Sequence, residues 1–320
     1  WADLDRLATL FLRGRLEGGA IRLPWVDLDL EEVSGEARIE GGVLHGRALS
    51  ARTLGALGTA GSLDVGLSAA DPVLELDIAI AAELSRLPGV LARLVRIPAF
   101  REQMGLVREV SGTARGRLTL RGTHEDVDVS VQAADLDLRG RYLPLPGPIA
   151  VRGGLFALEG REVRVSGVEA AVGGSRASGL EFRCREDPGG ALRLEAAAAA
   201  AEVDLAEAGL VASRLLPEGG LAVRGGRAAL REVRVAGMPR DPGTWRLSAA
   251  GELRELALEA AFLPGALKMG AARLEFLGDR LAFEGPAVEL ASSRAAEVAG
   301  VLAWGKEPEI AFRAARAALA

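Results

Sequence analysis

The chain has 320 residues, of which 49% are hydrophobic and only 4% aromatic, and its charged residues give a formal net charge of −5. Acidic and basic residues are interspersed, without the basic stripe and aromatic platforms used to bind nucleic acids, so we expect no nucleic-acid partner. The single cysteine, Cys184, excludes an internal disulfide and a cysteine-cluster zinc site. No window of about 18 strongly apolar residues occurs, so we expect no membrane-spanning helix.

Helical spacing of apolar residues appears in four short stretches. In the first, Leu4, Leu7 and Phe11 share one helical face, and at the start of the last Asp204 can cap the first turn. The four predicted helices cover residues 1–13, 85–96, 99–108 and 204–216.

Almost everywhere else, apolar and charged residues alternate with a period of two, which predicts strands with one apolar and one charged face. In VLELDIAIA at 73–81, for example, leucines and isoleucines alternate with acids and alanine. Turn signals such as Gly-Gly, Glu-Gly and Asp-Pro-Gly separate about two dozen short predicted strands. The last segment, EIAFRAARAALA, is expected to begin as a strand and to turn into a helix.

One stretch of the sequence recurs further along the chain. GREVRVSGVEAAVGGSRASG at 160–179 aligns with GDRLAFEGPAVELASSR at 278–294, at an offset of 118 (278 − 160). A looser third copy begins at Glu40. Because glycines and hydrophobic spacing recur while few identities do, the repeat predicts a structural unit. We expect one continuous elongated body over 1–320, cut at both ends from a longer protein, with repeat units at 1–96, 97–216 and 217–320.

The alternation leaves one apolar face that must be covered. Open sheets rarely exceed about ten strands without curling or splitting, four short helices are too few to cover so long a sheet, and the scarcity of aromatics argues against a sandwich. We therefore predict a mostly β protein, an antiparallel sheet curled into a U-shaped apolar groove. The predicted groove residues are Leu118, Leu120, Val129, Val131, Leu136, Leu138, Val163, Val165, Phe182, Cys184, Leu281 and Phe283.

Two adjoining stretches carry a family resemblance. LPLPGPIAVRGGLFALEGREVRVSGVEAAVGGSRASG at 143–179, preceded by SGTARGRLTLRGTHEDVDVSVQAADL at 111–136, resembles the AsmA-like family of the Gram-negative envelope, including its TamB and YhdP types. The resemblance implies a periplasmic segment of an inner-membrane-anchored protein. It also implies a β-groove that conducts phospholipids towards the outer membrane, in outer-membrane biogenesis or lipid homeostasis. The family brings no catalytic residues and no cofactor.

Motifs that could carry chemistry have plainer explanations. GVLAWGK at 300–306 has the spacing of a phosphate-binding loop, but Glu307 stands where Ser or Thr should bind magnesium. GGSRASG lacks the closing glycine of a nucleophile elbow, because Ala177 takes that place, and it is predicted to be a turn. Cys184 lies on the apolar side of its strand, where burial keeps a thiol protonated and inert.

A metal site is also not expected. His124, Glu125 and Asp126 fit a polar hairpin tip, and His45, the other histidine, lies far from them in the sequence. We predict no enzyme activity, no catalytic residue and no cofactor.

Three functions remain open. The first is non-enzymatic binding and transfer of phospholipid or another acyl lipid, with the inner and outer membranes as partners of the full-length protein. The alternative is a structural or chaperone-like β-scaffold that binds protein segments along strand edges in envelope assembly. The least supported is a carbohydrate binder or enzyme, which would need aromatic platforms and inward carboxylates. An open groove would favour the first function and a closed core the second.

Overall fold

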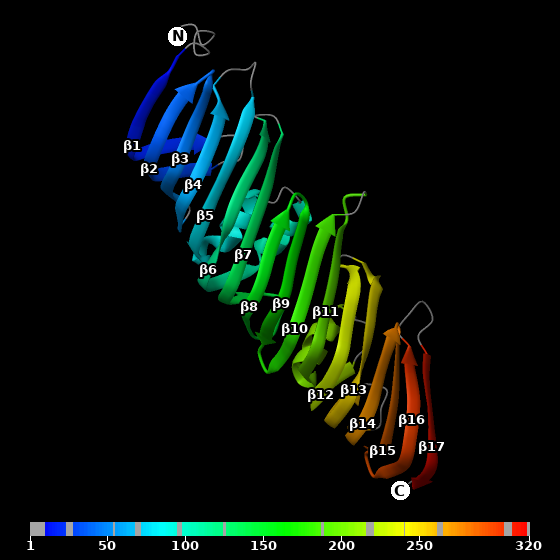
Figure 1. Ribbon diagram of the computed structural model, residues 1–320. Coiled ribbons are helices and arrows are strands. Elements are labelled where there is room, and N and C mark those ends of the chain that lie inside the picture. Colours follow the sequence, from blue (N-terminus) through cyan, green and yellow to red (C-terminus); the bar gives the residue numbers. More distant parts are fainter. Residues whose placement is uncertain are drawn as a thin grey trace. The chain divides into compact units, whose positions relative to one another are not determined.

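The structure, a computed structural model, is mostly β. It describes residues 10–23, 28–53, 55–67, 72–94, 98–123, 126–186, 189–215, 221–239, 241–260, 265–303 and 309–318. In these residues seventeen strands form one antiparallel sheet that is not closed into a barrel (Figure 1), with few helices, as the alternation predicts. The strands number fewer than the two dozen expected and are longer, because several predicted turns lie within continuous strands.

The strands follow one another along the chain. They are β1 (Leu12–Leu23), β2 (Leu28–Glu40), β3 (Val43–Thr53), β4 (Ala56–Gly66), β5 (Val73–Glu83), β6 (Val107–Thr123), β7 (Val127–Tyr142), β8 (Pro148–Glu159), β9 (Glu162–Val172), β10 (Ser175–Glu186), β11 (Leu192–Asp204), β12 (Leu221–Met238), β13 (Asp241–Ala260), β14 (Leu267–Gly278), β15 (Arg280–Leu290), β16 (Ser293–Ala303) and β17 (Glu309–Ala318). Consecutive strands pair antiparallel from β1 to β6 and from β10 to β17.

Helical segments interrupt the strands in two places. After β5 come a 3₁₀ helix, η3 (Leu84–Arg86), and the helices α1 (Leu87–Leu94) and α2 (Pro98–Met104); after β11 comes α3 (Leu205–Leu215). The helices predicted at 85–96 and 204–216 are therefore present within a residue or two.

Three of the helical predictions differ from the structure in whole or in part. Residues 1–9 of the helix predicted at 1–13 lie outside the described residues, and its end is wrong because Leu12 already begins β1. The helix predicted at 99–108 stops at Met104, because Val107 begins β6. The predicted turn to helix after residue 309 is also wrong, since β17 runs to Ala318 paired with β16. Ladder hydrogen bonds there override the helix propensity of its alanines.

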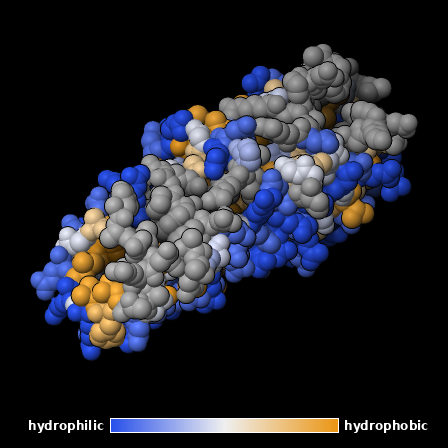
Figure 2. All heavy atoms as spheres, turned by 90° about the horizontal axis from the view of Figure 1, so that it is seen from above, coloured by the Kyte–Doolittle hydropathy of each residue, from blue (hydrophilic) through white to orange (hydrophobic). Residues whose placement is uncertain are grey.

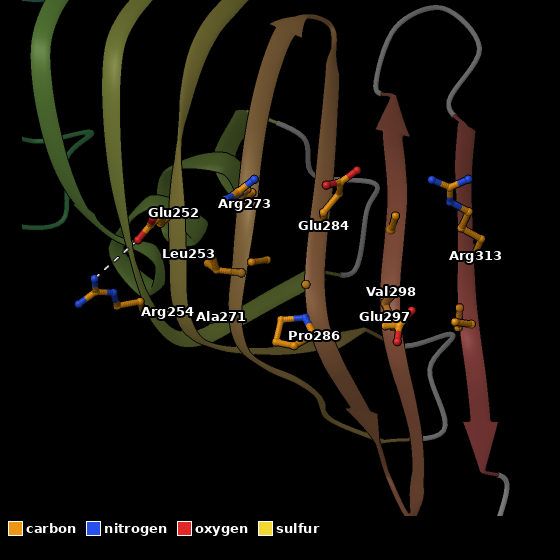
Figure 3. A pocket seen from close by; sticks show the side chains of 15 residues that line it. Glu252, Leu253, Arg254, Ala271, Arg273, Glu284, Pro286, Glu297, Val298 and Arg313 are labelled. Carbon is orange, nitrogen blue, oxygen red and sulfur yellow. Dashed lines mark ion pairs between the residues drawn. The ribbon is translucent and has the colours of Figure 1, made fainter.

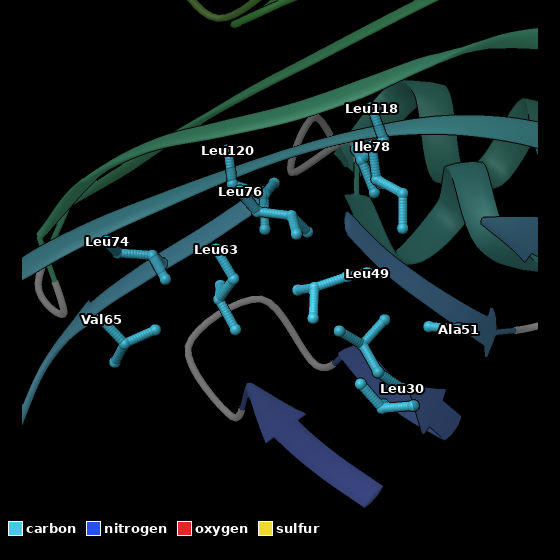
Figure 4. Close-up of a cluster of buried hydrophobic side chains, with 11 residues drawn as sticks. Leu30, Leu49, Ala51, Leu63, Val65, Leu74, Leu76, Ile78, Leu118 and Leu120 are labelled. Atoms are coloured by element: carbon cyan, nitrogen blue, oxygen red, sulfur yellow. The ribbon is translucent and has the colours of Figure 1, made fainter. Parts of the chain in front are cut away.

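The chain divides into two compact units. The first comprises 1–140 and 152–164, and the second 141–151 and 165–320. In the first unit, leucine, valine and isoleucine side chains of β2 to β6 point toward one another in a single buried cluster (Figure 4). In the second unit, a cluster of smaller residues from β12 to β14 plays the same part, joined by half-buried residues of β11, β15 and α3.

In most strands the alternation of inward and outward side chains is interrupted at one point and then resumes. In β2, β3 and β4 two consecutive outward residues separate two buried ones, and the second outward residue, Glu32, Ala48 or Ala60, is left-handed, with φ of 50°, 51° and 52°. The strand registers shift at these points, as at a β-bulge, which bends a strand locally. The same left-handed step recurs at Glu109, Asp135, Gly167, Gly179, Glu232, Glu255 and Glu297.

These left-handed positions explain why the sequence repeat conserves spacing rather than identity. At the offset of 118, Gly160 and Gly278 have φ of 55° and 70°, and Gly179 and Glu297 have 59° and 54°. Gly173 and Ala291, at 55° and 52°, form a third such pair. The repeat therefore places hairpin turns and left-handed strand residues at the same phase in each copy, and a residue other than glycine can hold the position.

Candidate functional site

The predicted groove residues of β6 and β7 lie on the apolar face of the first unit. Leu118 and Leu120 are buried members of the large cluster, and Val129 and Val131 are partly buried and pack against it. Leu136 and Leu138 are half-buried and alternate with exposed aspartates. The structure thus brings four of these residues together with Leu76 and its neighbours.

The remaining predicted residues are spread over β9, β10 and β15. Val163 and Cys184 are buried, with 5% and 2% of their surface exposed, whereas Val165 and Phe182 are half-buried. Leu281 and Phe283 are partly buried against the apolar cluster of the second unit. The predicted set is therefore distributed over strands of both units.

The apolar face of the first unit is filled by its own side chains. Leu63 of β4 is paired in register with Leu76 of β5, and Leu76 with Leu120 of β6. These three leucines are at most 1% exposed. Figure 4 shows them interlocked with residues from β2 and β3. This part of the face is a close-packed core.

The apolar face of the second unit is built differently, because large side chains alternate with glycine across the strands. One row runs from Leu230 through Gly251 and Leu274 to Phe283, and then through Gly300 to Phe312. Phe283 extends over Gly300, and its ring carbon Cζ lies so close that a Cβ on residue 300 would clash with it. Phe312 is 75% exposed. Phe283 and Phe312 are therefore at least partly accessible, whereas Leu230 and Leu274 are buried.

The opposite face carries ion pairs between neighbouring strands. Arg47 donates to both carboxylate oxygens of Asp64, at 2.7 and 3.1 Å, and His45 Nδ1 lies 2.8 Å from Asp64 Oδ1. Partial burial raises the pKa of Asp64, but the hydrogen bonds from Arg47 and His45 outweigh it and hold that pKa below its usual value. Seen from above, the described surface is mostly hydrophilic, with separate hydrophobic patches (Figure 2).

A hollow of about 790 Å³ lies over β13 to β17 (Figure 3). Its floor is strand backbone, because Leu253, Ala272 and Val298 are buried towards the apolar face. The charged side chains at its edge are Glu252, Arg254, Arg273, Glu284, Glu297 and Arg313. Three acids and three arginines balance, so the hollow favours neither anions nor cations.

The motif GGSRASG forms a hairpin turn, as predicted, and its residues hold α3. Gly174 N–H donates to both carboxylate oxygens of Glu207, at 3.1 and 3.0 Å, and Asp204 N–H donates to Ser175 Oγ at 2.9 Å. Ser175 is therefore a hydrogen-bond acceptor for a helix start. The sequence contained a signal for this, since Asp204 and Glu207 have the spacing of a capping box, but which hairpin they meet depends on strand pairing.

Cys184 is buried as predicted, and burial raises the pKa of its thiol to about 11. A thiolate is disfavoured there, so the residue is a poor nucleophile. Among the described residues no group of three potential metal ligands gathers, and no helix has the length and hydrophobicity to cross a membrane. His124, Glu125 and the segment 304–308 lie outside the described residues, so the proposed hairpin tip and the turn after GVLAW stay predictions.

Comparison of the chain with protein-family models, with curated proteins and with solved structures finds no match. The two faces of the sheet are therefore the features from which a function can be inferred.

Proposed function

We propose that the chain is a lipid-binding segment whose sheet curls into a U-shaped groove, with acyl chains held on the apolar face of the second unit. The observation that carries the proposal is the partial exposure of large apolar side chains on that face, where Leu281 and Phe283 are half-buried and Phe283 lies beside Gly300. A monomeric protein rarely leaves such a surface accessible unless it binds something.

The energetics of acyl-chain binding fit a face without dedicated polar contacts. Each methylene removed from water gains about 0.8 kcal/mol, so roughly a dozen methylenes hold a lipid without any recognition of its head group. Head groups would stay in water. We therefore expect binding to depend on the acyl chain of the lipid and not on its head group.

The resemblance of residues 111–179 to the AsmA-like family supports the same function and adds a cellular setting. In this proposal the segment lies in the periplasm of a Gram-negative envelope, in a protein anchored in the inner membrane, and passes phospholipid towards the outer membrane. It is a conduit rather than an enzyme.

A test introduces the same charge on each face of one strand. In the Phe283→Asp variant the carboxylate lies on the apolar face, where an unpaired charge costs several kcal/mol. In the Ala282→Asp control it lies on the charged face, opposite Glu275. Native mass spectrometry of protein incubated with phosphatidylglycerol should show lipid on the wild type and the control but not on Phe283→Asp. Leu281→Gln places a polar but uncharged side chain on the same face, so it tests the prediction if Phe283→Asp fails to fold, and it should also bind less lipid than the wild type.

A second function is favoured by one observation, the sealed apolar core of the first unit. Because Leu63, Leu76 and Leu120 leave no surface for a ligand, β2 to β6 could serve as a structural scaffold. If the wild type carries no lipid, or if Phe283→Asp carries as much as the wild type, this scaffold function becomes the better proposal.

A further inference from the structure

Hydrogen bonds tie the start of α3 to the β9–β10 hairpin, because one bond of the capping box is replaced by bonds to that hairpin. In an ordinary capping box the fourth residue's carboxylate accepts the N–H of the cap residue. Here Asp204 Oδ1 accepts Glu207 N–H at 3.1 Å, but the Glu207 carboxylate turns to Gly174 N–H in the β9–β10 turn. The Asp204 N–H is taken by Ser175 Oγ instead. The one bond that would join the Asp204 N–H to the Glu207 carboxylate is therefore replaced by bonds between each of these groups and the hairpin.

The turn is shaped to receive this carboxylate. Gly173 has φ of 55°, and a Cβ at that position would displace the Glu207 carboxylate. Gly174 lies against Asp204 Oδ2, 3.3 Å from where its Cβ would be. The sequence Gly-Gly-Ser thus provides room, a donor and an acceptor in consecutive residues.

An equivalent tether occurs after β5, in the other unit. Glu83, the residue before η3, donates its N–H to Gly55 O in the β3–β4 turn at 3.3 Å, and the Arg86 side chain lies over Gly55. Glu83 and Arg86 hold the same places relative to the helix start as Asp204 and Glu207. Recurrence with different side chains shows that the tether belongs to the architecture, while the carboxylate latch is particular to α3.

Beyond this tether, α3 is held by packing on β12. Gly209 lies against Val223 and Leu205 against Gly226, whereas Leu210 on the other side is 54% exposed. Leu205, at the start of the helix, packs against the apolar cluster of β12 to β14. The helix is therefore held both at its first turn and by packing along β12.

We propose that the Glu207 carboxylate is a latch that keeps α3 over the apolar face of the second unit, and that its release opens this end of the face to ligand. The opening of the face to ligand rests on the proposed function, whereas the role of Glu207 in holding α3 does not.

The test compares two glycines that have the same backbone conformation. Gly173→Ala and Gly160→Ala both place a side chain at φ of 55°, but only Gly173 faces Glu207, and nothing lies within 4 Å of the Gly160 position. Glu207→Ala removes the acceptor and Glu207→Gln keeps one. The readout is amide hydrogen exchange across the native protein without lipid.

We expect exchange in 205–215 to accelerate about tenfold or more in Gly173→Ala and Glu207→Ala, the size expected for loss of a hydrogen bond to a charged group. Gly160→Ala and Glu207→Gln should stay close to the wild type, and the amides of β14 and β15 should keep their protection in all four variants. Unchanged exchange in α3, equal acceleration in Gly160→Ala, or uniform acceleration throughout the second unit would each overturn the latch.

Uptake of phosphatidylglycerol with a fluorescent acyl chain separates the two proposals. A faster uptake in Glu207→Ala than in the wild type supports both. If the wild type takes up no probe while α3 exchange responds as expected, lipid binding fails and the latch stands. If the wild type takes up probe and α3 exchange does not respond, the latch fails and lipid binding stands.

Discussion

The apolar faces of the two units are made from the same alternating pattern but reach different packing. Across β4, β5 and β6 leucine lies beside leucine, and the three are at most 1% exposed. Across β12 to β17 glycine separates Leu230 from Leu274 and Phe283 from Phe312, and Phe283 stays partly exposed. Leucine beside leucine closes the face at β4 to β6, whereas the ring of Phe283 beside Gly300 stays partly accessible.

The largest expected effect concerns the sealed face. Leu76→Ala should lower the free energy of unfolding by about 2–5 kcal/mol, because the cavity between Leu63 and Leu120 cannot collapse. Phe283→Ala should cost less, about 1–2 kcal/mol, since part of that ring is accessible before truncation. Urea unfolding followed by circular dichroism measures both, and Leu57→Ala, at a site 46% exposed, is the control. Equal losses for Leu76 and Phe283 would contradict the comparison.

The next effect is the protection of Cys184 in β10. Because burial raises its thiol pKa from 9.0 to about 11, the thiolate at neutral pH should be about a hundredfold scarcer in the native protein than in the unfolded chain. A disulfide reagent should therefore react at least that much more slowly before denaturation than after. Comparable rates would show that β10 opens readily and that its apolar face resembles the accessible face of β12 to β17.

Strand type, the presence of one antiparallel sheet and the two helical insertions could be predicted from the sequence, because alternation and helical spacing are local signals. Leu118, Leu120 and Cys184 were also placed on the correct face by alternation alone. What alternation could not supply is which side chains become neighbours across strands. That Leu76 meets leucine while Phe283 meets Gly300 depends on register, and the register is set partly by bulges that the sequence does not mark.

The bulges escaped prediction because the left-handed residues are seldom glycine. Glu32, Ala48 and Ala60 take that conformation without the sequence signal that glycine would give. The tether of Glu207 to Gly174 was missed for a related reason, since the two residues lie far apart in the sequence and meet only through strand pairing. Local patterns therefore identified the elements, and the non-local contacts decided the packing and the candidate site.

A smaller effect is expected at the bulges in the strands of the first unit. Ala48 has φ of 51°, where a side chain costs about 1–2 kcal/mol, so Ala48→Gly should stabilise the protein by roughly 1 kcal/mol. Ala79, in the extended strand β5, is the matched control, and Ala79→Gly should destabilise by about 0.5–1 kcal/mol. Thermal unfolding of the two variants gives opposite signs if the bulge is formed. A loss of stability in both would show that β3 is extended at this point.

The smallest effect concerns the charged face, where both units should be alike. The folded-state pKa of Asp64 lies below its unfolded value of 3.8, so its carboxylate adds stability that is present above about pH 4 and is lost as the pH falls through the folded pKa. Asp64→Asn should therefore cost at most about 1 kcal/mol at pH 7, and the cost should vanish in strong acid. In the second unit Glu259 lies 2.8 Å from Arg224 on a more exposed part of the face, and Glu259→Gln should cost still less. Urea unfolding from pH 3 to 7 measures both differences. If Asp64→Asn cost as much as Leu76→Ala at neutral pH, stability in the first unit would reside in its charged face, and the contrast between the two apolar faces would no longer explain how the units differ.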